Sequence, residues 1–251
     1  MMADTKTGGS VFNEKADYPT AVASYDEKGV AAAIEWCIRH TGPGETISVW
    51  TSLKSNLRNC RELEDLVRKY RNVEHITGRG QGHPSGRGPV LMAWADMRDI
   101  GELVRFSSGI TGLCVISWNK EKLRPWVVAT EPEILGDGSA WHDVGASLHP
   151  VLLEALKSLT QTVNHNNTIS AGFEKDQVVG VLLALNKAGI PMDADQVQGW
   201  ALANGWSGSN PQRLAKYVED IRAGKRPRSR SVIRPDYIER LKQRASAADA
   251  D

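Results

Sequence analysis

The sequence predicts an α/β fold: a small, mostly parallel sheet with flanking helices, followed by an all-helical C-terminal domain. Two observations carry this prediction. Three short apolar runs, at 47–50, 91–94 and 115–118, each end in tryptophan, turn polar at once and are separated by helix-like amphipathic stretches. Such runs are typical of buried parallel strands. From Leu148 onward, by contrast, the pattern is helical alone.

In the first half, predicted helices and strands alternate. Gly42, Pro43 and Gly44 end the first helix, and Asp96 is placed to cap the third. We expect helices at 28–40, 59–70 and 96–106, and strands at 46–50, 73–77, 89–94 and 113–118. Residues 123–135 contain two prolines, which leaves them ambiguous between a short helix and an edge strand.

The second half carries the clearest local signals for helix ends. Asp193 with Gln196 forms a capping-box pattern, and Asn210 followed by Pro211 is a cap with proline at the first helical position. We expect helices at 151–163, 174–188, 193–204 and 211–223, then a short amphipathic helix at 235–244. The linker-like residues 136–139 (Gly-Asp-Gly-Ser) separate the halves. The predicted division is a loose arm at 1–20, an α/β domain at 21–138, a helical domain at 148–224 and a basic tail at 225–251.

The composition excludes several classes of protein. With 251 residues, 41% hydrophobic and 24% charged, the chain is ordinary for a globular protein. No apolar run approaches the roughly 18 to 20 residues that a membrane helix needs, and the N-terminus lacks a hydrophobic leader. The three cysteines (Cys37, Cys60 and Cys114) are far apart and odd in number, which argues against a disulfide framework or a zinc site. We therefore expect a soluble cytoplasmic protein with no metal, cofactor or membrane partner.

The ends of the three tryptophan-terminated runs form the first candidate site. In parallel sheets, ligands gather at the carboxyl ends of strands, and indoles stack well on planar ligands. The candidate pocket residues are Trp50, Lys54, Ser55, Asn56, Trp94, Asp96, Trp118 and Asn119. The alternative interpretation is that the indoles form the contact onto which the helical half docks, because tryptophan is heavily buried on average.

The glycine-rich stretch 78–88 is a second candidate. Its glycines match neither dinucleotide nor P-loop patterns, and the stretch leads into a strand instead of a helix. It is therefore either a mobile basic connection or a loop in which Arg79, His83 and Arg87 close over an anion.

Other catalytic or base-reading sites have ordinary structural explanations. Asp96, Asp99 and Glu102 could offer carboxylates to a metal, but capping and the first helical turn explain them equally well. Cys60, between Arg58 and Arg61, could be an activated nucleophile or simply a small residue on a helix. A helix-turn-helix reader would present Gln212, Arg213 and Lys216, although its turn is long and a plain helical bundle also fits.

Charge gives the last candidate surface. The segment from Arg222 to Arg244 contains nine lysines and arginines and two acids, so it carries +7, and the rest of the chain carries about −6. The nucleic-acid candidates are Lys225, Arg226, Arg228, Arg230 and Arg234. We expect a binding or regulatory protein whose basic C-terminus, contributing little to the fold, contacts nucleic acid non-specifically or docks a protein partner. The alternative is an enzyme or a sensor of nucleotide-like ligands at the tryptophan-lined sheet edge; the sequence leaves catalysis open.

Overall fold

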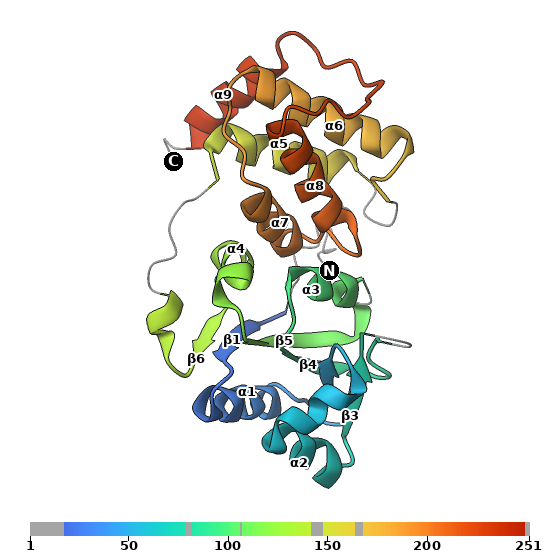
Figure 1. The fold of residues 1–251 in the computed structure, drawn as a ribbon, viewed down its shortest axis with the longest axis vertical. Coiled ribbons are helices and arrows are strands. Elements are labelled where there is room, and N and C mark those ends of the chain that lie inside the picture. Colours follow the sequence, from blue (N-terminus) through green and yellow to red (C-terminus); the bar gives the residue numbers. More distant parts are fainter. Residues whose placement is uncertain (1–17, 79–81, 106, 142–147, 164–167, 249–251) are drawn as a thin grey trace, which may run out of the picture.

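The computed structural model describes residues 18–78, 82–105, 107–141, 148–163 and 168–248. Its first part is a six-stranded parallel sheet with helices on both faces, and its second part is helical (Figure 1). The strands are β1 (Thr20–Ser24), β2 (Ile47–Thr51), β3 (Val73–Thr77), β4 (Gly88–Ala93), β5 (Ile110–Ser117) and β6 (Glu133–Leu135). The helices of this part are α1 (Glu27–Arg39), α2 (Arg61–Lys69), α3 (Met97–Val104) and α4 (Lys120–Thr130). The predicted fold class is confirmed.

The strand order, β3-β2-β4-β5-β1-β6, determines where a ligand could bind. Helices α1 and α2 cover one face of the sheet, and α3 and α4 cover the other. The chain leaves β2 through α2 towards β3, but leaves β4 through α3, on the opposite face, towards β5. The carboxyl ends of β2 and β4 therefore flank a topological switch point, where parallel sheets open a crevice.

Two strands of the sheet were not predicted as such. The first, β1, begins at the last residue of the expected loose arm and lies between β5 and β6, with Ala21, Val22 and Ala23 fully buried. Residues 1–17 of that arm lie outside the described residues. The ambiguous stretch 123–135 contains both a helix and an edge strand, because α4 ends at Thr130 and the edge strand β6 follows Pro132.

The connection from β3 to β4 contains no helix among its described residues. Glu74 of β3 fixes this connection to the sheet. The Ser85 backbone N–H, in the connection, donates to Glu74 Oε1 at 2.9 Å, and the Ser48 hydroxyl of β2 donates to the same oxygen at 2.7 Å. Burial alone would raise the pKa of Glu74, but the hydrogen bonds from Ser85 and Ser48 outweigh it and lower that pKa. The connection is thus tied back along β3 towards the start of β4.

The helical part consists of α5 (Pro150–Thr162), α6 (Gly172–Lys187), α7 (Ala194–Ala203), α8 (Asn210–Arg222) and α9 (Tyr237–Ala248), which share one core. Trp206, between α7 and α8, is fully buried in this core, and its indole N–H donates to the Thr160 hydroxyl at 2.8 Å. No helix among the described residues is long and apolar enough to span a membrane.

The helical part docks on the layer formed by α3 and α4. A Cβ added to Gly199 of α7 would lie 2.3 Å from the carbonyl carbon of Pro125 in α4, so the two helix backbones touch. The Gly208 N–H also donates to the Gly101 carbonyl of α3 at 2.7 Å. The hypothesis that the helical half docks on the three indoles of the sheet edge is therefore wrong, because the helical half contacts α3 and α4.

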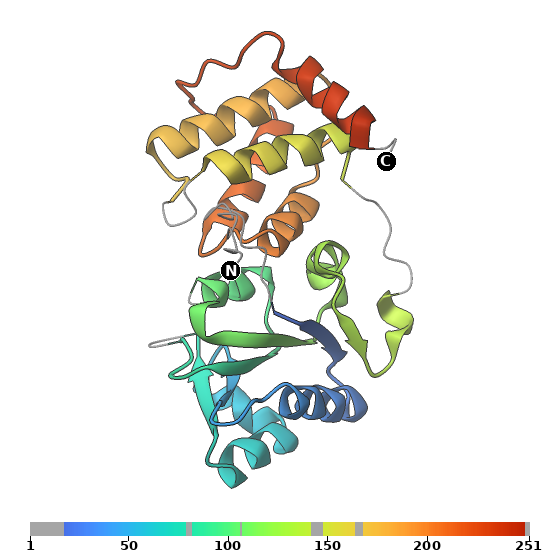
Figure 2. The same cartoon turned by 180° about the vertical axis from the view of Figure 1, so that it is seen from behind.

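The basic tail is part of the fold, which corrects the expectation that it contributes little. Residues 225–236 form an extended strap that arches over α6, and α9 then lies beside α5 (Figures 1 and 2). The Ser229 hydroxyl donates to the Asp176 carbonyl of α6 at 2.7 Å, and Leu241 of α9 is fully buried in the helical core. A truncation after Gly224 would therefore remove core residues as well as charge.

Candidate functional site

The three indoles lie in different environments. Trp50 is within β2 and only 3% exposed, against the α3 face of the sheet. Trp94 follows β4 with φ of +61°, which is unusual for a bulky residue, and its half-buried indole packs on the opposite, α1 side. Trp118 is 57% exposed. These positions give the indoles no common wall.

The polar residues predicted beside the indoles mostly serve local structure. Asp96 Oδ1 accepts from the Asp99 N–H at 2.9 Å and Asp99 Oδ2 accepts from the Asp96 N–H at 3.2 Å, a capping box that starts α3. Asn119 caps α4 by accepting from the Lys122 N–H at 3.2 Å. Lys54, Ser55 and Asn56 belong to the 3₁₀ turn η1 (Lys54–Asn59), whose described residues are half-buried or exposed.

The candidate anion loop is divided between the two edges of the sheet. Arg87 Nε donates to Glu45 Oε1 at 3.0 Å, just before the amino ends of β2 and β4. His83 lies at the carboxyl edge, where it lines the crevice. Arg79 lies outside the described residues. The structure therefore does not bring His83 and Arg87 to one anion.

A cavity of about 700 Å³ opens at the switch point between β2 and β4. Three parts of the chain line it: the end of β2, the β3–β4 connection and α3. The lining residues are Trp50, Ser52, Leu53, Gly78, Gly82, His83, Arg98, Asp99, Glu102 and Leu103. Burial raises the pKa of Asp99, as does the neighbouring charge of Asp96. Perturbed acids in clefts are candidates for function.

Two chemical hypotheses receive no support from the geometry. Burial raises the pKa of the Cys60 thiol, whose Sγ donates to Glu62 at 3.2 Å, so Cys60 lacks the lowered pKa that nucleophilic cysteines need. Among the described residues, no group of three or more histidines, cysteines, aspartates or glutamates could hold a metal ion.

A second groove, in the helical part, is strongly basic. It has a volume of about 1720 Å³ and lies between α6, the end of α8, the strap and the start of α9. Two acids line it, Asp176 and Glu239. Eight basic residues line it: Lys175, Lys187, Lys225, Arg226, Arg228, Arg230, Arg234 and Lys242. All five nucleic-acid candidates of the sequence thus belong to a single surface.

Side chains of the strap alternate between two environments. Pro227, Ser229 and Ser231 are half-buried, whereas Arg226, Arg228 and Arg230 are exposed. The inward side is small because the strap packs closely: a Cβ at Gly180 of α6 would lie 3.0 Å from the Ser231 Cβ. This period of two, typical of extended chain, leaves every second side chain exposed. The Arg-x-Arg-x-Arg spacing was the sequence signal for this arrangement.

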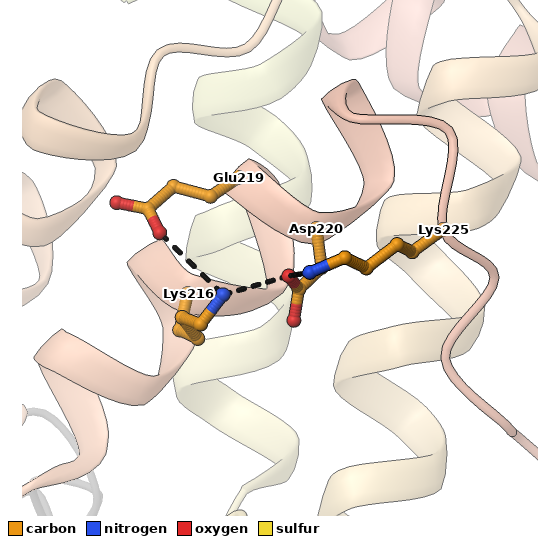
Figure 3. Close-up of polar contacts among 4 residues, drawn as sticks. All are labelled: Lys216, Glu219, Asp220 and Lys225. Carbon is orange, nitrogen blue, oxygen red and sulfur yellow. Dashed lines mark hydrogen bonds and ion pairs between the residues drawn. The ribbon is translucent and has the colours of Figure 1, made fainter.

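Lys225 differs from the four arginines because it is already paired. Figure 3 shows Lys216 and Lys225 converging on Asp220, with Nζ to Oδ1 distances of 2.7 and 2.8 Å, and Glu219 lying 3.7 Å from Lys216. The hydrogen bonds from Lys216 and Lys225 lower the pKa of the Asp220 carboxyl. This cluster anchors the start of the strap to α8.

The same cluster bears on the helix-turn-helix hypothesis. Lys216 is one of its three base-contacting candidates, and the ion pairs with Glu219 and Asp220 occupy it. By contrast, the arginines at 226, 228, 230 and 234 make no ion pair with any described residue. The strap therefore carries a row of arginines without ion pairs among the described residues.

Comparison with known proteins identifies one similarity. Residues 148–242 match a family model described as "Domain of unknown function (DUF1889)". The match begins just before α5 and ends within α9, so the strap lies inside it. No curated protein and no solved structure matches the chain.

Proposed function

We propose that this protein is a non-enzymatic binding or regulatory protein that contacts nucleic acid non-specifically through the basic groove. The observation that carries the proposal is the row of exposed arginines on the strap, Arg226, Arg228 and Arg230, held outward without ion pairs among the described residues. Cations kept apart from carboxylates remain available to phosphates, and releasing counterions from phosphates drives such binding.

The groove favours contact with the backbone of a nucleic acid over contact with its bases. None of the described residues that line it is aromatic, so bases have no ring on which to stack. Its cations come from an extended segment and from helix surfaces, and guanidinium groups match phosphate geometry well. We therefore expect little preference for base sequence and a strong dependence on salt.

The test replaces the three strap arginines together, as Arg226→Gln, Arg228→Gln and Arg230→Gln. If these three arginines and Arg234 each neutralise one phosphate, log affinity for a duplex falls against log salt with a slope of about −3 to −4. The triple variant reduces the steepness of this slope by about 2 to 3. The matched control removes the same charge from exposed arginines of the α/β part, with Arg58→Gln, Arg61→Gln and Arg71→Gln.

Fluorescence anisotropy with a labelled duplex, titrated at several salt concentrations, measures both slopes. Binding that survives in the strap variant, or that falls equally in the control, overturns the proposal. Because the substituted side chains are exposed, circular dichroism of the variant should match that of the parent protein.

The sequence also suggested an enzyme or a nucleotide-like sensor at the sheet edge. The cavity between β2 and β4 favours some ligand there, but no exposed indole face lines it, because Trp50 is nearly fully buried. The chemistry of that cavity points to a different class of ligand.

A further inference from the structure

The crevice between β2 and β4 has the position and size of a ligand site. It lies at the carboxyl ends of the two strands whose following connections diverge, which is where open parallel sheets bind ligands. Its volume of about 700 Å³ is within the range of roughly 300 to 1,000 Å³ typical of small-molecule sites. Trp94, at the end of β4, holds a left-handed backbone with φ of +61°. Strain of this kind gathers at functional sites.

Charges of both signs line this crevice. The Arg98 side chain is 59% exposed, and its Nη2 lies 3.6 Å from Asp99 Oδ1, so the pair is loose. The Asp99 side chain is only 17% exposed, and Glu102, one turn further along α3, lines the same cavity. A ligand with a single sign of charge would leave one of these groups facing a like charge.

The start of α3 argues against a phosphate ester as the ligand. Helix N-termini bind phosphates through free backbone N–H groups. Here the side chain of Asp96 accepts from the Asp99 N–H, and the two carboxylates of this capping box lie where a phosphate would approach. The start of α3 therefore disfavours a phosphate dianion at this edge.

Apolar and polar groups complete the cavity. Leu53, which is 38% exposed, offers apolar surface, and the Ser52 hydroxyl, which accepts from Asn56 Nδ2 at 2.9 Å, retains its own O–H as a donor. A ligand with one anionic end, one cationic end and a short body therefore matches the lining.

We propose that the crevice binds a free α-amino acid, with its carboxylate on Arg98 and its ammonium group on Asp99 and Glu102. The side chain of the amino acid lies against Leu53. This site is separate from the basic groove, so it does not depend on nucleic-acid binding.

Calorimetric titration of the full-length protein with each standard amino acid tests the proposal. The amino acid that binds most tightly is then compared with its N-acetyl form, which lacks the ammonium, and its carboxamide, which lacks the carboxylate. Each blocked form should bind about 10- to 100-fold more weakly, because a charge-assisted hydrogen bond is lost. Failure of every amino acid to bind overturns the proposal, as does equal binding of a blocked form or binding of a nucleoside monophosphate in its place.

Two variants assign the ends of the ligand. Arg98→Gln should weaken binding of the unmodified amino acid but should not change binding of its carboxamide. Likewise, Glu102→Gln should weaken binding of the unmodified amino acid but should not change binding of its N-acetyl form. The matched control, Arg71→Gln with Glu64→Gln on exposed positions near α2, should leave binding unchanged. The strap triple variant should also bind the amino acid normally, which separates this result from that of the groove. An equal effect of Arg98→Gln on parent and carboxamide would show that Arg98 does not hold the carboxylate.

Discussion

Leu241→Ala measures how firmly α9 and the strap belong to the helical core. Leu241 is completely buried in that core, on the helix that packs against α5. Truncating a fully buried leucine removes its transfer free energy and leaves a cavity, which costs about 2 to 5 kcal/mol. We expect a loss of about 3 kcal/mol in the free energy of unfolding, a large part of the roughly 5 to 15 kcal/mol of a typical domain. Removal of everything after Gly224 should cost more, because Ala245 and the strap contacts are lost as well.

Urea unfolding followed by tryptophan fluorescence and circular dichroism provides the measurement, because Trp206 lies in the same core. Gln243→Ala is the control: it changes an exposed neighbour on the same helix and should alter stability by no more than about 0.5 kcal/mol. If Leu241→Ala unfolds at the same urea concentration as Gln243→Ala, α9 is not docked as described. An unchanged midpoint for the truncated chain would refute the same reasoning and restore a dispensable tail.

Three further substitutions test the sheet and the contact between the two parts. Trp50→Ala should lower the free energy of unfolding by about 3 to 5 kcal/mol, whereas Trp118→Ala, at an exposed position, should change it by no more than about 0.5 kcal/mol. Equal losses of stability in urea unfolding would mean that the two indoles share one environment. Gly199→Ala gains about 1 kcal/mol of helix propensity, but it places a Cβ 2.3 Å from the Pro125 carbonyl carbon. We therefore expect a lower melting temperature in thermal unfolding. A raised melting temperature would show that the contact between α7 and α4 is looser than described.

Most of the fold could be predicted because its strong elements carry local signals. The strands β2, β4 and β5 are runs of large apolar residues, and α7 and α8 begin with recognisable caps or prolines. The strand β1 was missed because Thr20 to Ser24 is short and contains only small apolar residues around Val22. Its burial comes from pairing with β5 and β6, which are distant in the chain. Local pattern cannot reveal a strand whose stability is supplied by its neighbours.

The strap illustrates how charge can conceal packing. Composition drew attention to the arginines, but Ser229 and Ser231, the serines beside Arg230, are the residues that contact α6 or approach it closely. Such small side chains have no hydrophobic signature, so a stretch that packs closely resembles a solvated tail. In α9, Leu241 and Ala245 are spaced by four residues, which is the helical signal that a buried face leaves in an otherwise polar segment.

The tryptophan-lined pocket could not be judged from the sequence because it depended on register. Pairing places Trp50 level with Met92 of β4, two residues before Trp94, and Ala93 level with Ile116 of β5, two residues before Trp118. The three runs therefore end at different heights along the sheet. Because side chains alternate between the two faces of a strand, Trp50 lies on the α3 face, whereas Trp94 and Trp118 come after the last residues of their strands. Strand order then determines which loops meet. The crevice joins α3 to the β3–β4 connection only because β4 lies beside β2, a neighbour that no local pattern specifies.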